Sequence, residues 1–346
     1  MVTISDVAKR AGVSAASVSR HMSGGTVGGA DRIDAAIKEL RYRPNQSARG
    51  LRSGRHGCVG VIVPDITNPL FASLVNGIES ALAGDDIRVL LANSNEDPAR
   101  EVALVADLAS RTDGLILIPP VETDPVLDEP ALSGVPVVLV DRALTTGTDV
   151  DFVLVDNRQG ARLAAEHLMS LGHKEIAVIS GPLSSTPGRQ RHEAFLEALA
   201  DAGQPVRTEH VRLSDFRVGG GHSAMASLLD DTSTPPTAVF TANNLMTIGA
   251  MRLLRERRVS IPAQMSLVGF DDLDLSELLD PPPTVIDRAT FGLGASAAEM
   301  LRARLAAPDR AQQHLILPVE LIVRGSTSSP SPRRPARRPS PRPSSR

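Results

Sequence analysis

The stretch VTISDVAKRAGVSAASVSR at residues 2–20 decides how the amino-terminal part of the chain folds. Its first half carries apolar residues at helical spacing, which predicts a short helix with one buried stripe: Ile4, Val7, Ala8 and Ala11. Thr3 is placed to cap this helix with Asp6 as its acidic partner, and Gly12 is suited to end it in a tight turn.

Ser14 is placed to cap a second short helix, which turns Val18 and Met22 inward. The residues on its outward face are Ala15, Ala16, Ser17 and Arg20. Two short helices joined by a tight glycine turn form a helix-turn-helix. The small residues and the single arginine give the second helix a shape that can enter a DNA major groove.

A third helix follows a glycine-rich loop. The loop runs from Ser23 to Ala30, and Asp31 is placed to cap a helix that continues to Leu40. Pro44 cannot continue that helix. Residues 46–55, QSARGLRSGR, are long enough for about two helical turns, which are marginal alone in water. From the residues alone, this segment is either a basic linker or a helix that orders only against a partner.

From Cys58 onward, short apolar runs alternate with helical segments. The runs are CVGVIVP (58–64), IRVLLAN (87–93), DGLILIPP (113–120), VPVVLVDR (135–142), EIAVISGP (175–182), TAVFTAN (237–243) and SLVGFDD (266–272). The helical segments are 71–83, 98–110, 158–171, 190–202, 219–229, 245–257 and 290–306. Such runs fit strands buried on both faces, and two sets of repeated β-α units predict two doubly wound parallel-sheet lobes. The fold class is therefore α/β with an all-α head.

The expected domains follow from these patterns. The helix-turn-helix domain spans 1–45, a linker or hinge helix 46–56, and a two-lobed domain 57–327. Lobe one covers about 58–157 and 288–310, and lobe two about 158–287 and 311–327. Residues 328–346 contain only Ser, Pro and Arg apart from Ala336, so we expect a disordered basic tail.

Charge is segregated along the chain, although the formal net charge is only −3. Residues 1–56 carry ten Lys and Arg against four Asp and Glu, residues 57–327 carry 21 against 36, and residues 328–346 carry six Arg and no acid. A basic head on an acidic body predicts that the head meets a polyanion and that the body does not. The arginines of the tail either add nonspecific attraction to DNA or are merely solvated.

Composition narrows the function classes. The chain has 346 residues with 42% hydrophobic content, no apolar run near the length of a membrane span and no charged-then-apolar leader, so we expect neither secretion nor a membrane anchor. The single cysteine, Cys58, cannot form an internal disulfide, which fits a reducing cytoplasm. Dinucleotide, Walker, serine-hydrolase and metal-ligand motifs are missing, so the sequence predicts no enzyme, metal or cofactor.

Several blocks, in order, resemble the lactose-repressor (LacI/GalR) family of bacterial transcription regulators. The blocks are VTISDVAKRAGVSAASVSR, RPNQSARGLRSGR, VGVIVPDITNPLF, GPLSSTPGRQRHEAF, VGFDD and VRGST, so the resemblance covers nearly the whole chain to about Thr327. It implies two lobes like those of periplasmic binding proteins, with a sugar or related effector between them. The chain departs from the family at His21-Met22-Ser23, where members usually carry Val-Leu-Asn, and at Asn244, where aspartate is frequent.

The DNA-contacting residues are predicted from chemistry and from this resemblance. Arg20 is the candidate for a direct base contact, because an arginine pairing with guanine is the commonest specific contact. Ala15 and Ala16 occupy the family's base-reading positions, and Leu51 matches the leucine that the family's hinge helix wedges into the minor groove. The candidates for phosphate contacts are Thr3, Ser14, Ser17 and Tyr42.

Polar side chains at strand ends predict a ligand cleft between the lobes. The candidates are Asp65, Asn68, Phe71, Ser184, Arg191, Phe216, Asn244 and Asp271. Carboxylates, amides and a guanidinium suit hydroxyl-rich ligands, and Arg191 and Asp271 match the two family positions most tied to ligand holding. The alternative reading of the residues makes Asp271 a loop or helix cap and Arg191 a surface ion-pair partner.

The expected function is a ligand-responsive transcription regulator that binds an operator as a homodimer; repression is the favoured reading, and activation stays open. Inducer and corepressor action use the same linkage with opposite sign, so both stay open, as does the identity of the effector. Two alternatives remain: a periplasmic-type solute-binding protein, and an architectural DNA binder whose body takes no ligand.

Overall fold

A computed structural model describes residues 2–22, 24–42, 56–85, 87–123, 125–145, 150–273 and 275–331. The chain divides into two compact units, residues 1–57 and residues 58–346. We call them the head and the body. The predicted hinge segment 46–55 and Leu51 lie outside the described residues.

The head contains the three predicted helices, α1 (Ile4–Ala11), α2 (Ala15–Met22) and α3 (Ala30–Glu39). Thr3 and Asp6 form the predicted capping box of α1, and Gly12 ends that helix in the left-handed region at φ 64°. The small apolar core joins all three helices through Val7, Ala8, Ala11, Val18, Ile33 and Ala36. The helix-turn-helix prediction is confirmed.

The prediction that Asp31 caps α3 is wrong. The residue before the helix is Gly29, which has a left-handed φ of 83° and makes no side-chain cap, so the helix begins at Ala30, two residues earlier than predicted. Asp31 instead lies in the first turn, where its negative charge interacts favourably with the positive end of the helix dipole.

The first lobe of the body is a six-stranded sheet in the order β11-β5-β4-β3-β1-β2, and its neighbouring strands pair in parallel. The strands are β1 (Cys58–Val63), β2 (Arg88–Asn93), β3 (Gly114–Leu117), β4 (Val137–Val140), β5 (Asp151–Val155) and β11 (His314–Leu317). The helices are α5 (Pro69–Leu82), α6 (Pro98–Ala109) and α11 (Thr290–Ala306), with short turns η1 (Ala83–Asp85), η2 (Pro125–Asp128) and η3 (Pro130–Leu132).

The second lobe repeats the same plan in the order β12-β10-β9-β8-β6-β7, with only β12 antiparallel to its neighbour. The strands are β6 (Ile176–Ser180), β7 (Val211–Leu213), β8 (Ala238–Thr241), β9 (Ser266–Phe270), β10 (Thr284–Arg288) and β12 (Val319–Ile322). The helices are α7 (Asn157–Ser170), α8 (Thr186–Asp201), α9 (Val218–Asp230) and α10 (Asn244–Glu256), with short turns η4 (Thr208–His210) and η5 (Ser276–Leu278).

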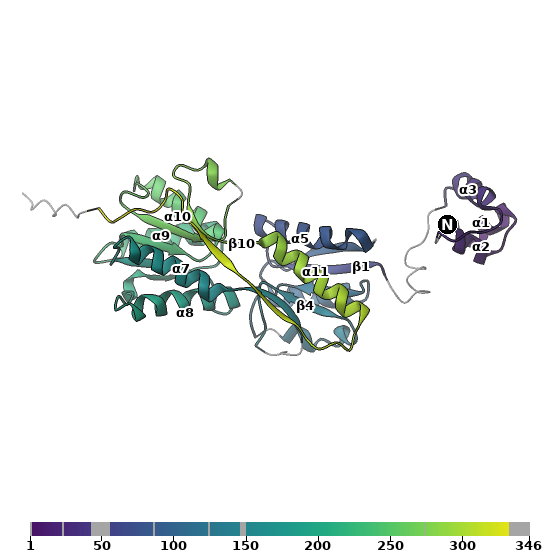
Figure 1. Cartoon of the computed structure of the whole chain (residues 1–346), viewed down its shortest axis with the longest axis horizontal. Coiled ribbons are helices and arrows are strands. Elements are labelled where there is room, and N and C mark those ends of the chain that lie inside the picture. The colour runs from purple at the N-terminus through teal and green to yellow at the C-terminus, as the bar shows by residue number, and fades with distance from the viewer. Residues whose placement is uncertain are drawn as a thin grey trace, which may run out of the picture. The chain divides into compact units, whose positions relative to one another are not determined.

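The predicted lobe boundary near the carboxyl end needs correction. Residues 311–317 were assigned to lobe two, but His314–Leu317 form β11, which pairs with β5 of lobe one. The next strand, β12, pairs with β10 of lobe two. The chain therefore crosses between lobes at Pro318, and Figure 1 shows this crossing as the yellow ribbon that runs from one lobe into the other.

The other differences from prediction are local. The sequence patterns did not reveal the short strands β5, β7, β10 and β11 as separate elements. The prediction that β2 is buried on both faces is wrong, since it is a sheet edge with Leu90 and Leu91 partly exposed. Helix α8 begins at Thr186 rather than Gln190, because Ser185 accepts from the Gly188 amide and Pro187 lies in the first turn.

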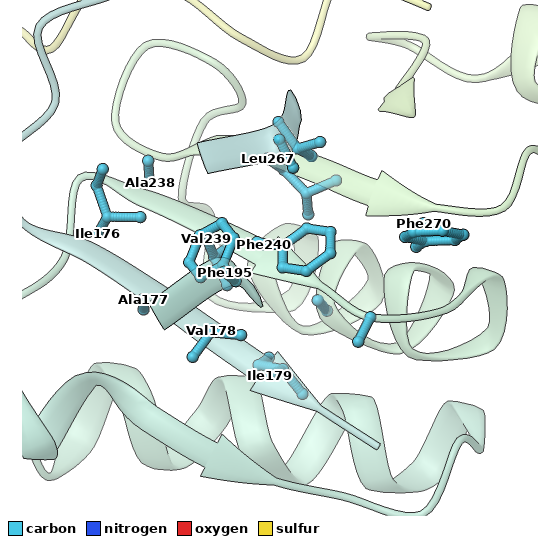
Figure 2. Close-up of a cluster of buried hydrophobic side chains, with 14 of the residues drawn as sticks. Ile176, Ala177, Val178, Ile179, Phe195, Ala238, Val239, Phe240, Leu267 and Phe270 are labelled. Carbon is cyan, nitrogen blue, oxygen red and sulfur yellow. The ribbon is translucent and has the colours of Figure 1, made fainter. Parts of the chain in front are cut away.

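The core of lobe two is packed mostly between its strands and helices α7–α10. The rings of Phe195 and Phe240 stack at its centre with their centroids 4.7 Å apart. Figure 2 shows this pair among the labelled side chains of β6 and β8, and shows Phe270 apart from it at the carboxyl end of β9. Phe270 therefore lies between the hydrophobic core and the carboxyl end of the sheet, where the polar residue Asp271 follows β9.

The predicted tail is ordered at its start. The ring of His173 donates to the Ser328 carbonyl oxygen at 2.8 Å, and the hydroxyl of Ser331 donates to the Ala263 carbonyl at 2.8 Å. The prediction of disorder is therefore wrong for residues 328–331, which pack on lobe two. Residues 332–346 lie outside the described residues. In the described ranges, the helices lack the length and hydropathy that a bilayer crossing requires.

Helices α5 and α11 pack at unusually close range because both contribute a glycine to their contact. A Cβ added to Gly77 would lie 2.1 Å from the Phe291 carbonyl oxygen, and one added to Gly294 would lie 2.0 Å from the Leu74 carbonyl oxygen. Since backbone rather than flexible side chain fills these positions, the two helices would have to separate to admit a methyl group.

We expect Gly77→Ala to lower the free energy of unfolding by about 1–3 kcal/mol through overpacking, measured by urea denaturation followed by circular dichroism. Gly84→Ala is the matched control, because no atom of the described residues lies within 4 Å of its added Cβ. If the two variants were equally stable, the close contact between α5 and α11 would not constrain the fold.

Candidate functional site

The outward face of α2 is the candidate DNA interface of the head. Ala15, Ala16 and Arg20 are exposed, as predicted, while Val18 on the opposite side is fully buried. Because Val18 is inserted into the core, α2 cannot rotate about its axis. The head therefore presents two methyl groups and one guanidinium on a fixed surface.

The predicted phosphate-contacting side chains have clear local roles. The Thr3 hydroxyl accepts from the Asp6 amide at 3.3 Å, and the Ser14 hydroxyl accepts from the Ser17 amide at 3.1 Å, so both cap helices. Ser17 and Ser14 also share a hydrogen bond of 2.9 Å between their hydroxyls. Tyr42 is half-buried and packs against the head core.

The candidate ligand cleft of the body lies where the carboxyl ends of both sheets face each other. In both lobes the strand order reverses beside the first strand, β1 or β6, and loops at such switch points form ligand sites. A cavity there has a volume of about 30 Å³. Six of the eight predicted residues line it: Asp65, Asn68, Phe71, Arg191, Phe216 and Asp271.

The other two predicted residues lie at the junction of the lobes outside the lining. Ser184 is exposed, and its carbonyl oxygen accepts from the Glu122 amide of lobe one at 2.7 Å. Asn244 is buried and exchanges two hydrogen bonds with Asn68 of lobe one, at 2.8 and 3.3 Å. The amide of Asn244 donates in the shorter of these bonds, which an aspartate at this position could not do.

Sequence reasoning missed several charged residues of the cleft. They are Glu96, Asp141, Arg142, Asp215, Arg217 and Arg288. The signal for two of them was visible, since Asp141 and Arg142 directly follow the buried strand β4. Arg288 ends β10, a strand that the sequence patterns did not resolve.

Alternating buried charges cross the cleft. Arg288 of lobe two forms a very short ion pair with Asp141 of lobe one, and its Nε lies 2.7 Å from an Asp271 oxygen. Asp271 in turn lies 3.6 Å from Arg191 Nη1. All four side chains are at most 4% exposed. We call this series Asp141–Arg288–Asp271–Arg191 the charge chain.

Arg191 is held from several sides, yet one of its nitrogens is free for a ligand. Its Nε donates to Asn157 at 2.8 Å, its Nη1 donates to the Ala242 carbonyl at 2.7 Å, and its guanidinium lies 3.5 Å from the centre of the Phe270 ring. Its Nη2 is buried and has no hydrogen-bond partner among the residues that the structure describes. Burial lowers the pKa of Arg191 to about 10 although Asp271 opposes the shift, so the group stays charged at neutral pH.

Arg142 holds the rim of lobe one. It pairs with both carboxylate oxygens of Glu96 at 2.7 and 2.8 Å and also donates to the carbonyls of Pro119 and Pro120. Its guanidinium lies 5.8 Å from the centre of the Phe216 ring, which belongs to lobe two. The phenyl ring of Phe216 therefore forms one wall of the cleft against a buried cation.

Backbone strain gathers at this cleft. Glu96, Asp141, Phe216 and Asp271 all have left-handed φ angles, between 60° and 69°. Non-glycine residues rarely adopt this region, and such strain persists where the surrounding structure imposes it, commonly at binding sites. Here it turns the side chains that follow β2, β4, β7 and β9 toward the space between the lobes.

The lobes are closed over the cavity. Both carboxylate oxygens of Glu122 in lobe one accept from one edge of the Arg189 guanidinium in lobe two, from Nε at 2.9 Å and from Nη2 at 3.0 Å, and the Thr186 hydroxyl accepts from the Ala143 amide at 2.9 Å. A volume of about 30 Å³ is room for a water molecule and not for a sugar, so a sugar-sized ligand requires the lobes to separate. In the described ranges, no group of three or more His, Cys, Asp or Glu could hold a metal ion.

Family models match both units of the chain. Residues 3–45 match the model described as "Bacterial regulatory proteins, lacI family", and residues 56–324 match "Periplasmic binding proteins and sugar binding domain of LacI family". Together these matches cover the head, the two lobes and nearly all candidate site residues.

Similar proteins are known in sequence and in structure. The "Ribose operon repressor" of Escherichia coli (strain K12) is 33% identical over 334 residues, which cover 94% of this chain and 100% of that protein. The lac repressor dimer bound to operator and the anti-inducer ONPF has a TM-score of 0.83 at 29% identity, covering 94% and 99% of the two chains. A LacI family regulator from Enterococcus faecium with bound ribose has a TM-score of 0.70 at 33% identity, covering 79% and 100%.

Because of the charge chain, the free energy of unfolding should decrease as the pH becomes acid. Burial raises the pKa of Asp141, but Arg288, Arg142 and Arg191 outweigh burial and hold the pKa below its ordinary value of 3.8. In acid the unfolded chain therefore binds a proton that the folded protein does not. The stabilisation from Asp141 is complete above about pH 5 and is lost as the pH falls below 3.8 toward the depressed pKa.

We expect Asp141→Asn to lower the free energy of unfolding at pH 7 by about 3–5 kcal/mol, because Arg288 loses its closest counter-charge. The difference from wild type should narrow as the pH falls below 3.8. Urea denaturation at pH 7, 5 and 3 measures both effects. Asp230→Asn, whose pair with Arg257 is exposed, should cost less than about 1 kcal/mol. An Asp141→Asn variant as stable as wild type at pH 7 would contradict the role of the charge chain.

Proposed function

The chain belongs to the LacI family of bacterial regulatory proteins, and from this membership we propose that it represses transcription by binding a pseudo-palindromic operator as a homodimer. The observation that carries the proposal is the exposed face of α2 on a basic head, joined to an acidic body with a polar cleft. The ribose operon repressor and the operator-bound lac repressor dimer, both similar along their full length, support it.

In this proposal Arg20 makes the base contact that gives most of the sequence preference. Ala15 and Ala16 carry no hydrogen-bonding group, so they contribute shape and contact with thymine methyl groups. Thr3, Ser14, Ser17 and Tyr42 contact phosphates and set the register, and Leu51 wedges into the minor groove. Because such a regulator must reach the chromosome, we propose that the protein is located in the bacterial cytoplasm. We also propose that it has no catalytic activity.

We expect Arg20→Ala to reduce the preference for operator over scrambled duplex by about 1–3 kcal/mol, because a bidentate contact to guanine is lost. Binding to the scrambled duplex should fall only slightly. Titration by fluorescence anisotropy measures both affinities, with the operator taken as the duplex that the wild-type protein enriches from a randomised pool. Equal loss on both duplexes would assign Arg20 to phosphate contact instead.

We further propose that the effector is a neutral, hydroxyl-rich molecule bound in the cleft. Arg142, Arg191 and Arg288 are matched by Glu96, Asp141 and Asp271, so the buried charges balance and leave no excess cation for a phosphate or carboxylate. Hydroxyls can accept from Arg191 Nη2, which is buried without a hydrogen-bond partner among the described residues, and can donate to the carboxylate of Asp271, whose Oδ1 also lies 2.7 Å from Arg288 Nε. Asp65, Asn68, Phe71 and Phe216 complete the site, while Ser184 and Asn244 act at the junction between the lobes.

We expect a neutral monosaccharide to raise the melting temperature in a thermal-shift screen, because a ligand that binds only the folded state stabilises it by mass action. The phosphorylated form of the same sugar is the matched control and should give no shift. A response to anionic ligands alone would contradict the charge-balance argument. No response to any small molecule would favour a body that takes no ligand.

A further inference from the structure

The turn that follows α2 folds back onto the side chain of Arg20. The Gly24 amide donates to the His21 carbonyl at 3.0 Å, and the Gly25 amide donates to the Arg20 carbonyl at 2.9 Å. Gly24 has a left-handed φ of 79°, which reverses the chain at this point. The backbone of Gly25 therefore lies directly beside the residue proposed to read a base.

The contact between Gly25 and Arg20 leaves no room for a side chain at position 25. An added Cβ would lie 2.7 Å from Arg20 Cγ, 3.0 Å from its carbonyl oxygen and 3.5 Å from its Cδ. Carbon atoms in favourable contact are about 3.5–4.0 Å apart, so a methyl group here forces the stem of Arg20 to move. Because residue 25 is a glycine, its backbone can lie against the Cγ of Arg20 and restrict the conformations of that side chain.

The helix that carries Arg20 is itself anchored on both sides. Val18 is fully buried in the head core, and the His21 ring lies 2.8 Å from an Asp34 oxygen on α3. The position of α2 and the conformation of the Arg20 side chain are therefore both restricted in the free protein. Arg20 is the one residue with a hydrogen-bonding group among the exposed trio Ala15, Ala16 and Arg20, so the direction of its guanidinium decides what this surface can read.

We propose that Gly25 is a positioning residue for base recognition, because its lack of a side chain lets the turn after α2 hold Arg20 in the conformation that meets a base edge. The inference rests on the proposed function, in particular on Arg20 as the base contact. An arginine that is ordered before binding loses less conformational entropy on binding, and this advantage applies to the specific contact.

The test compares full-length wild type with Gly25→Ala and with Gly28→Ala as a matched control. In the described part of the head, nothing lies within 4 Å of a Cβ at Gly28, which is in the same loop. The probes are the duplex that wild type enriches from a randomised pool and a scrambled duplex of the same composition. We expect Gly25→Ala to lower the preference for the enriched duplex by about tenfold, equivalent to about 1.4 kcal/mol, and to leave scrambled binding unchanged. Gly28→Ala should behave like wild type.

A double-mutant cycle with Arg20→Ala separates positioning from a structural role. Truncating Arg20 removes the Cγ and Cδ atoms that the new methyl group would meet and leaves the Arg20 carbonyl oxygen at 3.0 Å, so Gly25→Ala should cause little further loss of preference in that background. The double variant should also bind scrambled DNA as well as Arg20→Ala alone, even if Gly25→Ala by itself weakens folding of the head.

Three results would overturn the inference. Gly25→Ala could keep the wild-type preference, or it could lower preference by the same factor with and without Arg20. The double variant could also bind scrambled DNA worse than Arg20→Ala, which would make Gly25 purely structural. These results leave the proposed function intact. A wild-type protein that enriches no duplex would instead contradict the proposed function, and the role of Gly25 with it.

Discussion

The attraction between oppositely charged side chains buried at the junction of the lobes is the constraint on which the cleft depends. Removing two charges from water costs several kcal/mol each, so such a series is tolerated only when every member has a partner. Asp141 belongs to one lobe, whereas Arg288, Asp271 and Arg191 belong to the other, so separating the lobes also breaks an ion pair. Opening the body therefore exposes the charges of Asp141 and Arg288 to water, and closing it buries them again as a pair.

A ligand can shift the equilibrium between the closed and the open arrangement of the lobes only by as much as its affinity differs between the two. Three further pairs also join the lobes: Asn68 with Asn244, Glu122 with Arg189, and Ala143 with Thr186. A molecule that binds one arrangement of the lobes better than the other moves the population by its difference in affinity, whichever arrangement it prefers. The same argument applies to an inducer and to a corepressor, which differ only in the arrangement of the lobes that they prefer.

Much of the fold could be predicted from local patterns. Helical spacing in residues 4–22 specified the head, and apolar runs such as CVGVIVP specified the central strands, because strands buried on both faces must be apolar throughout. The edge strand β2 was misjudged because an apolar run does not reveal its neighbours. Arg288 was missed because its role depends on Asp141, a residue 147 positions away whose proximity no local pattern encodes. Asp271 and Arg191 were predicted from their places after strands together with the resemblance to the family, but their pairing was not.

The half-buried Tyr42 has a practical consequence. It is the only tyrosine of the chain, which has no tryptophan, and it packs against the core of the head. Ultraviolet emission excited at the phenol band therefore arises from the head, although the body contributes most of the far-ultraviolet dichroism. Melting of the two units can be followed separately in one unlabelled sample, and any influence of a sugar on the small unit becomes optically visible.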